Sequence, residues 1–212
     1  MTTTREGTCT RRGLAVLTLA GMAGLALPLR AETNPMPEEL RAAIERQPFA
    51  PVLGNPDGDV TLTEFFDYNC PYCRKGVPAL KKLIAGDSGL RVVLREWPIF
   101  GEDSLAATQV SLATLKQGKY LEFHTAMMAG KDRAGMASAM RVAKALGLDT
   151  ARLKRDMDSA EVMDHIEHSM ALADHMGLSG TPTWIAGHGG AFGYQTLGDL
   201  RNLVAQARKD LL

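Results

Sequence analysis

The sequence predicts an α/β fold in which helices cover a sheet and one all-helical segment is inserted. Strand-like and helix-like patterns alternate up to residue 97, helical patterns then continue from about 102 to 178, and two short strands and a helix close the chain. The composition agrees, because 212 residues with 45% hydrophobic and 23% charged side chains suit a globular protein and exclude a disordered chain.

The first 31 residues are expected to be an export signal rather than part of the fold. Arg5, Arg11 and Arg12 precede an uncharged, Ala- and Leu-rich stretch over 13–29, and cleavage is expected near Ala31. The Arg pair resembles a twin-arginine signal, and the general secretory route stays open beside it. An uncleaved membrane anchor is the disfavoured alternative, because the stretch only just reaches spanning length and contains Gly and Pro. An exported chain would lie in the periplasm, where disulfides form.

The remaining elements follow from the spacing of apolar residues. Residues 32–55 are predicted to contain a short amphipathic helix over 38–47 and a linker, because 48–58 holds three Pro and two Gly. The main domain is expected to span 56–212. We predict strands at 60–66, 90–97, 183–186 and 191–195, and helices at 71–85 and 197–209 on either side of the helical insertion.

Charge and cysteine content narrow the function classes. The 24 basic and 24 acidic residues give a formal net charge of zero, so there is no broad basic surface for nucleic acid. Three cysteines are too few for a disulfide-dense scaffold. Removal of the signal would take Cys9 with it and leave only Cys70 and Cys73.

Cys70-Pro71-Tyr72-Cys73 lies where the predicted strand 60–66 gives way to a helix. Pro71 suits the first helical turn, which places Cys70 at the helix N-terminus. The free N–H groups and the helix dipole there stabilise a thiolate, so we expect a lowered pKa and a nucleophilic Cys70. A disulfide to Cys73, one turn on, closes a very short loop and suits exchange better than a structural role. A zinc site is disfavoured, because no second cysteine pair supplies further ligands.

A second motif, Gly180-Thr181-Pro182-Thr183, opens a predicted strand. Proline is tolerated at the first residue of a strand, and on the residues alone this Thr-Pro pair is an ordinary turn signal. Taken with the segment from Thr63 to Cys73, however, the motif resembles the DsbA-like branch of the thioredoxin superfamily, in particular its ScsC/Com1-like members. The resemblance covers residues 56–210 and implies a thioredoxin fold with an inserted all-helical subdomain.

The resemblance also implies roles for individual residues. Cys70 would be the attacking thiol, Cys73 the buried resolving thiol, and Pro182 a cis residue facing the disulfide that the two cysteines form. The backbone of Thr181 would pair with an extended client peptide, a recognition mode that tolerates many sequences. Tyr72 and Pro71, which lie between the cysteines, are expected to contact the client as well.

Glu64 is a further candidate, six residues before Cys70. The resemblance suggests a buried carboxylate that takes up a proton as Cys73 is deprotonated. Period two places Glu64 on the same face as Leu62 and Phe66, which favours burial over the alternative of a solvent-facing strand residue.

The sequence departs from the family pattern at two points. The dipeptide between the cysteines is Pro-Tyr, whereas strongly oxidising members carry Pro-His, and Tyr72 lacks the cationic character that helps a thiolate. No other cysteine remains after residue 31, so no structural disulfide would accompany the active one.

Other residues are assigned ordinary roles. His165 and His168 are predicted to face water, opposite an apolar stripe formed by Val162, Ile166, Met170 and Ala173, and no metal site is expected there. The methionines of the helical insertion are expected to fill its core, with a client-binding groove as the alternative. Arg74 or Lys75 is expected to lie on a solvated helix face, with added stabilisation of the Cys70 thiolate as the alternative.

We therefore expect an exported thiol–disulfide oxidoreductase that works as a monomeric oxidase on unfolded or partly folded client proteins containing cysteines. It should need no cofactor beyond the Cys70–Cys73 pair, and a membrane or periplasmic redox partner would reset that pair. Two alternatives remain open. One is a disulfide isomerase or reductase that a partner keeps reduced. The other, from a different class, is a copper-tolerance protein that binds Cu(I) through the two sulfurs.

Overall fold

A five-stranded mixed sheet lies at the centre of residues 35–211, the part of the chain that the computed structural model describes. The expected export signal lies outside these residues. The strands are β1 (Val52–Gly54), β2 (Val60–Phe66), β3 (Leu90–Glu96), β4 (Thr183–Ala186) and β5 (Gly189–Phe192), in the spatial order β1-β3-β2-β4-β5. The two central strands β2 and β3 are parallel, and every other neighbouring pair is antiparallel.

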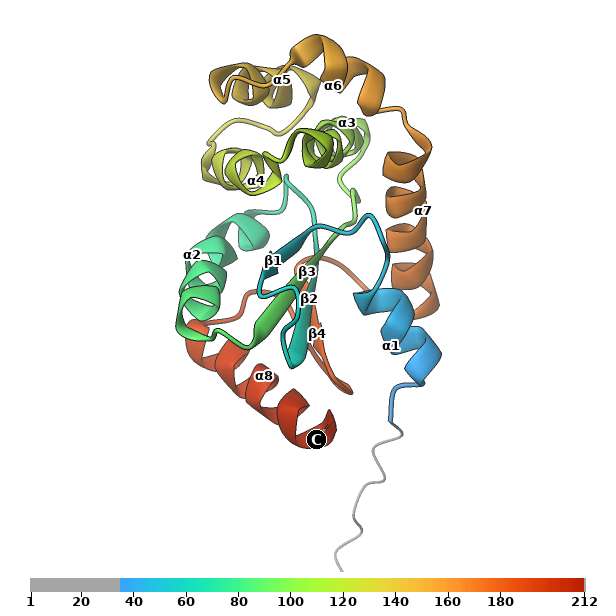
Figure 1. Cartoon of the computed structure of the whole chain (residues 1–212), viewed down its shortest axis with the longest axis vertical. Helices are drawn as coiled ribbons and strands as arrows, with labels where there is room; N and C mark the ends of the chain where they lie inside the picture. Colours follow the sequence, from blue (N-terminus) through green and yellow to red (C-terminus); the bar gives the residue numbers. More distant parts are fainter. Residues whose placement is uncertain (1–34, 212) are drawn as a thin grey trace, which may run out of the picture. The chain divides into compact units, whose positions relative to one another are not determined.

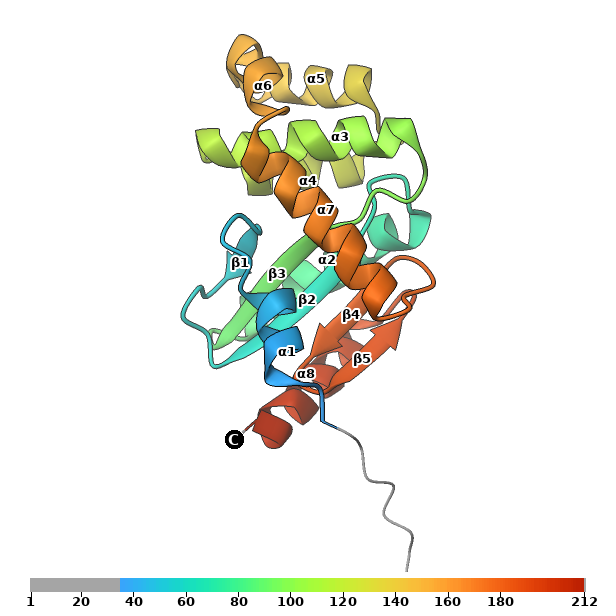
Figure 2. The ribbon, with the colours of Figure 1, turned by 90° about the vertical axis from the view of Figure 1, so that its right-hand side faces the viewer.

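Helices cover both faces of this sheet (Figures 1 and 2). On one face lie α2 (Pro71–Gly86) and α8 (Leu197–Leu211), and on the other lie α1 (Glu38–Glu45) and α7 (Ala160–His175). Alternate residues of β2 and β3 point to opposite faces, so Leu62 and Leu94 join the main core under α2 and α8, whereas Phe65 packs with Ile44 and Ala173 under α1 and α7. The predicted α/β fold with a thioredoxin-type core is confirmed.

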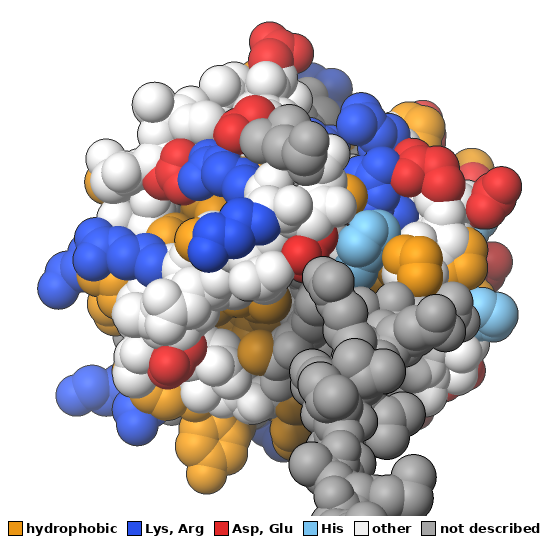
Figure 3. Space-filling view, turned by 90° about the horizontal axis from the view of Figure 1, so that it is seen from below, with side chains coloured by type: hydrophobic (Ala, Val, Ile, Leu, Met, Phe, Trp, Pro, Cys, Tyr) orange, Lys and Arg blue, Asp and Glu red, His pale blue; other side chains and the backbone are white. Residues whose placement is uncertain are grey.

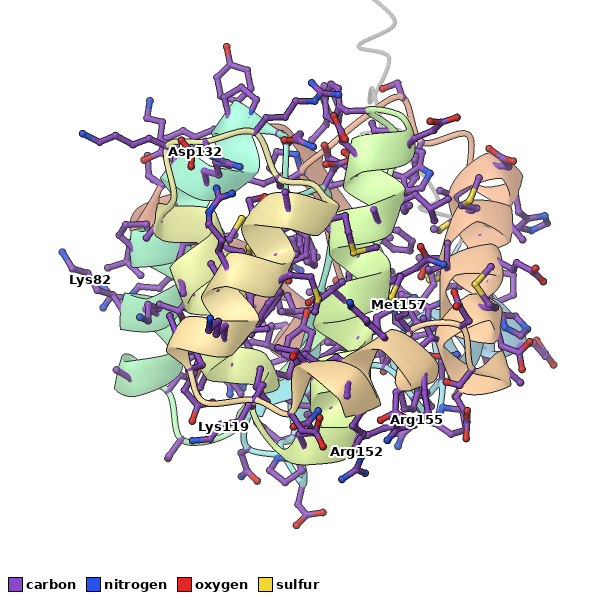
Figure 4. All side chains as sticks on the ribbon, turned by 90° about the horizontal axis from the view of Figure 1, so that it is seen from above. Lys82, Lys119, Asp132, Arg152, Arg155 and Met157 are labelled. Carbon is purple, nitrogen blue, oxygen red and sulfur yellow. The ribbon has the colours of Figure 1, made fainter. Side chains whose placement is uncertain are left out.

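The inserted helices form a layer above one end of the sheet (Figure 1). They are α3 (Glu102–Ala113), a 3₁₀ turn (Thr114–Gln117), α4 (Tyr120–Ala129), α5 (Met136–Ala145) and α6 (Thr150–Asp156), and α7 leads back to the sheet. Met157 lies among these helices, whereas Lys119, Arg152 and Arg155 lie at their margin (Figure 4). Met127, Met128 and Met157 are buried, so the expected role of methionine as core filler holds for these three side chains.

Two local predictions were wrong. The segment 48–58, expected to be a linker, contains β1, which pairs with β3 at the sheet edge. Three residues are too few to show an alternating pattern, and the flanking Pro and Gly hide the strand. The last strand begins at Gly189 rather than Ala191, because pairing with β4 fixes its register although two of its four residues are glycine.

His165 also differs from expectation. Its imidazole is fully buried, with Nε2 2.7 Å from Glu96 Oε2 and Nδ1 2.8 Å from Gln47 Oε1, whereas Met170 of the supposed apolar stripe is 44% exposed. Helix α7 packs against both β3 and α3, so its buried surface is wider than one stripe and includes this polar residue. His168 is exposed, as expected.

The distribution of charged side chains on the surface agrees with the equal numbers of basic and acidic residues in the sequence. On the face shown in Figure 3, basic and acidic side chains lie among one another rather than in one block of a single sign. Within residues 35–211, none of the helices combines the length and apolar character that crossing a bilayer requires.

Candidate active site

Both cysteines lie at the N-terminus of α2 as free, buried thiols. Cys70 is the N-cap residue and Pro71 occupies the first helical turn, as the sequence predicted. The Cys70 sulfur accepts a hydrogen bond from the Cys73 backbone N–H at 3.4 Å, and its thiol donates to the Thr181 carbonyl at 3.2 Å. The helix start therefore brings one sulfur to the edge of the sheet, against the loop that precedes β4.

The two thiols differ sharply in acidity. The pKa of Cys70 is lowered from 9.0 to about 6, first by the hydrogen bond with the Cys73 side chain, and further by contacts with Thr181 and with the N–H groups of Cys73 and Tyr72, against the opposing effect of burial. Burial first, and then the same hydrogen bond and the charge of Glu64, raise the pKa of Cys73 far above its usual value. Near neutral pH the pair therefore holds a thiolate at Cys70 and a thiol at Cys73.

Glu64 lies in β2 and is only 4% exposed, so the burial inferred from its period-two position is observed. Desolvation, followed by the negative charge of Cys70, raises the pKa of this carboxyl well above its usual value. Glu64 in turn contributes to the raised pKa of Cys73. A carboxyl whose pKa is raised, and which lies within electrostatic reach of both sulfurs, has the properties of a proton donor and acceptor for the pair.

The loop before β4 faces Cys70. The Thr181–Pro182 peptide bond is cis, as the resemblance implied. The Pro182 carbonyl accepts the Gly193 N–H at 2.8 Å, which ties this loop to the chain that leaves β5. Thr181 is buried, and its carbonyl oxygen is the acceptor for the Cys70 thiol.

A hollow of about 400 Å³ adjoins this loop; we call it the front hollow. It has an aromatic lining and includes main chain next to Cys70; its residues are Tyr72, Ile99, Phe100, Ser179, Gly180, Thr181, Phe192, Gly193 and Tyr194. Tyr72, predicted from its place between the cysteines, is 57% exposed here, and Pro71 is exposed at the helix start. Sequence analysis did not single out Phe100, Phe192 or Tyr194, although exposed aromatic side chains in loops and at strand ends can indicate a binding surface.

A polar cluster fixes the segment that carries Phe100. One carboxylate oxygen of Asp67 accepts from Ser104 Oγ at 2.8 Å and from the Asn69 N–H at 2.7 Å, and the other accepts the Phe100 N–H at 3.1 Å. The Asn69 side chain bonds both backbone groups of Ala134, at 2.8 and 2.9 Å. These bonds join the strand end before Cys70 to the helical insertion, which positions one wall of the front hollow.

Arg74 and Lys75 contact groups other than the Cys70 sulfur. Three backbone carbonyls accept hydrogen bonds from the Arg74 guanidinium, those of Tyr68, Gly130 and Asp132, at 2.6 to 3.1 Å. The Lys75 ammonium lies over the Tyr194 ring, 4.2 Å from its centre. Neither residue is among the main causes of the low Cys70 pKa. Arg74 joins the helical insertion to α2, and Lys75 supports an aromatic wall of the front hollow.

A thioredoxin core with an uneven dithiol at a helix N-terminus and a facing cis-proline defines the class of thioredoxin-fold thiol–disulfide oxidoreductases. The model of the DSBA-like thioredoxin domain family matches residues 61–205, and the chain belongs to this family.

Solved structures of thioredoxin-like proteins support this family assignment. A thioredoxin-like oxidoreductase from Silicibacter pomeroyi DSS-3 is 46% identical, with a TM-score of 0.78, over 80% of this chain and 98% of that one. A periplasmic thioredoxin-like protein from Salmonella enterica serovar Typhimurium is 26% identical, with a TM-score of 0.74, over 82% and 98%. The thiol–disulfide exchange protein α-DsbA2 from Wolbachia pipientis is 28% identical, with a TM-score of 0.73, over 79% and 91%.

The curated relatives are much longer proteins. A Na⁺/H⁺ antiporter, NhaA 3 of Salinispora tropica, is 29% identical over 151 residues, which are 69% of this chain and 23% of the antiporter. NhaA of Herminiimonas arsenicoxydans is 30% identical over 135 residues, 63% of this chain and 21% of that protein. The chain thus spans less than a quarter of the length of these relatives.

Proposed function

We propose that this protein is an exported thiol–disulfide oxidase that passes the Cys70–Cys73 disulfide to client proteins. The observation that carries the proposal is the uneven acidity of the two thiols. A Cys70 pKa near 6 means that the reduced pair holds a stabilised thiolate at neutral pH. Stabilising the reduced form makes the disulfide form the better oxidant.

The exchange takes place in two steps. A client thiolate attacks Cys70 Sγ of the disulfide, a client–Cys70 bond forms, and the Cys70–Cys73 bond breaks to release Cys73 as a thiolate. A second client thiolate then attacks the client sulfur of this mixed disulfide and releases Cys70 as a thiolate. The client loses two electrons and gains a disulfide, and the Cys70–Cys73 pair gains both electrons.

We assign Glu64 the proton transfer at Cys73. Because the pKa of Cys73 is raised by burial, its thiolate needs a proton as soon as it is released, and Glu64, whose own pKa is raised by burial, can supply it. In the reverse direction Glu64 takes the proton as Cys73 attacks the mixed disulfide.

The front hollow is assigned to the client. The main chain at Thr181 would pair with an extended client segment, with Pro182 beside the sulfurs. Tyr72 and Pro71 lie at the start of α2, and the aromatic walls would accept apolar client side chains, which unfolded or partly folded proteins expose.

Export to the periplasm, a monomeric state and a membrane or periplasmic redox partner that resets the pair complete the proposal. The export signal proposed from the sequence, with cleavage near Ala31, supports the location. The periplasmic relative from Salmonella enterica supports it independently.

The acidity of Cys70 is tested by following thiolate absorbance with pH. We expect half-ionisation near pH 6. A matched pair isolates its largest cause, because Cys73→Ala removes the hydrogen bond to Cys70 and should move the titration toward 9, whereas Cys73→Ser keeps a hydroxyl donor and should leave it low. Titration of the unmodified protein near 9 would contradict the proposal.

The direction of exchange is tested by equilibrating the pair against a glutathione series and by trapping its state in cells with an alkylating agent. A mostly oxidised pair is expected of an oxidase. A mostly reduced pair would instead establish the isomerase or reductase alternative. Stoichiometric Cu(I) binding that survives a competing chelator, with no exchange on a model peptide, would establish the copper-binding alternative.

A further inference from the structure

A second hollow, of about 200 Å³, lies between β1, α2 and α4; we call it the rear hollow. It shares no lining residue with the front hollow. Its apolar walls come from all three elements and are formed by Leu53, Val77, Leu80, Ile84, Ala85 and Leu121. Along α2, Leu80 lies about 15 Å beyond Cys70, at 1.5 Å per residue. The rear hollow is therefore too far from Cys70 to hold the reacting sulfurs, and disulfide exchange does not account for its presence.

The rear hollow is of a size to hold a small ligand. An apolar cavity of about 150 Å³ binds benzene, so this one has room for a ring or a short alkyl chain. Leu121 is 48% exposed and Lys81 is exposed at its margin, so a ligand can reach the interior without unfolding of the core. The aliphatic walls favour an apolar ligand body and disfavour a ligand with several charges.

The polar side chains of the lining are Lys81, His124 and Thr125, and the first two narrow the ligand class. Lys81 projects from α2 and pairs with no carboxylate within residues 35–211. His124 is 97% buried, and its Nδ1 lies 3.1 Å from the Tyr68 hydroxyl. Burial lowers the pKa of His124 to about 4, with a smaller contribution from the Lys81 charge, so the imidazole is neutral at pH 7. Lys81 is thus the one cation in the lining, and none of the lining residues is acidic.

We propose that the rear hollow is a binding site for a small apolar carboxylate, an acid with a single ring or short alkyl body. The body would pack between Leu80, Ile84 and Leu121, and the carboxylate would meet the Lys81 ammonium. Charge complementarity decides the class of ligand. The single unpaired cation, Lys81, lies beside an apolar hollow and therefore favours a ligand with one negative charge on an apolar group. This site is independent of the proposed oxidase activity, since none of its residues takes part in exchange.

The test is a titration of the full protein with phenylacetate, followed by NMR of the backbone amides. We expect saturable shifts at Leu53, Ile84 and Leu121, and none at Tyr72 or Phe192. The neutral isostere phenylacetamide should bind about fivefold more weakly, a factor of the size expected for an exposed ion pair.

Three variants sharpen the test. Lys81→Met keeps the apolar stem but removes the charge, so phenylacetate should lose about fivefold in affinity and phenylacetamide should lose nothing. Lys82→Met is the matched control, because Lys82 is absent from the lining and points away from the molecule (Figure 4), and its affinities should be unchanged. Ala85→Phe fills the hollow from an exposed helix position and should abolish binding of both probes.

Circular dichroism of each variant verifies that it is folded. The proposal is overturned by an absence of saturable shifts in the unmodified protein, by shifts confined to the front hollow, or by equal affinity for the two probes. Binding by the Cys70→Ser variant, which cannot exchange disulfides, distinguishes failure of this proposal from failure of the proposed oxidase function.

Discussion

The front and rear hollows lie along the same helix, α2, and yet they present different chemistry. The front hollow adjoins Cys70 and combines aromatic side chains with the main chain of Gly180 and Thr181. The rear hollow has half its volume, aliphatic walls and one cation, Lys81. The front hollow therefore suits an extended peptide that reacts at sulfur, whereas the rear hollow suits a small apolar ion that does not react.

Under the two proposals, one helix serves two sites. At the N-terminus of α2, the free N–H groups of the first turn act on Cys70, the residue that caps the helix, and help to lower its pKa. Further along, the helix acts only through one face of its side chains, here Val77, Leu80 and Ile84, and through the partners that this face meets in β1 and α4. If this separation is correct, changes at one hollow leave the other unaffected.

The largest effect is expected from Cys70→Ser. Exchange with a model dithiol peptide should fall to the uncatalysed rate, because the attacking sulfur is removed. Phenylacetate binding at the rear hollow should be unchanged. Both are measured on the same protein, by a fluorescence assay of peptide oxidation and by NMR titration. Retention of exchange by the variant would move the chemistry away from Cys70.

Glu64→Gln should slow exchange by about 100-fold, at the lower end of what positioned proton transfer contributes. The amide keeps the shape of the carboxyl but carries no proton to give, so reduction of the disulfide should stall as Cys73 is released. Rapid mixing with a model dithiol peptide resolves this step. Glu167→Gln, on the exposed surface of α7, is the control and should react at the normal rate.

Phe192→Ala should raise the KM for a model peptide about fivefold, with little change in kcat, because an exposed aromatic wall binds the client but does not touch the reacting sulfurs. Leu121→Ala is the matched control. Phe192 is 61% and Leu121 48% exposed, but Leu121 belongs to the rear hollow. An equal rise in KM for both variants would mean that the client extends over α4 and that the two hollows form one surface.

A pH dependence of stability is expected from the front site. The Cys70 pKa is depressed to about 6 in the folded reduced protein, so the stability it contributes is present above the unfolded value near 9 and is lost as pH falls through 6. The melting temperature of the reduced form, relative to the oxidised form, should therefore rise between pH 6 and 9. His124 in the rear hollow should not titrate there, because its pKa is about 4. An unchanged difference across this range would contradict the assignment.

Local chemistry allowed much of the active site to be predicted. The position of Cys70 at a helix start follows from Pro71 and from the change of pattern after Phe66, both of which are properties of neighbouring residues. The burial of Glu64 was predicted from the face that it shares with Leu62 and Phe66, and in the structure every residue of β2 is buried because helices cover both faces of the sheet. The cause of the low Cys70 pKa was only partly predicted. Sequence analysis attributed it to the helix N-terminus, but its largest cause is the hydrogen bond with the Cys73 side chain in the reduced pair.

Predictions failed where contact with a distant element decided whether a residue is buried or whether a segment is a strand. On α7, the predicted burial of Val162 and Ile166 is observed. The burial of His165 was not predicted, because nothing within the helix sequence shows that its imidazole contacts Glu96 of β3. A short strand such as β1 has the same difficulty, because its pairing with β3 rather than its own residues makes it a strand.

The sequence by itself determined most of the elements, the α/β order and the pair of sulfurs, since each depends on residues a few positions apart. Only the tertiary structure decided what surrounds the sulfurs, because Tyr72, Phe100 and Phe192 belong to segments that are far apart in the chain. The same is true of the rear hollow, where β1, α2 and α4 meet. Hollows form between elements, and their shape depends on how distant segments pack, which no local spacing of residues specifies.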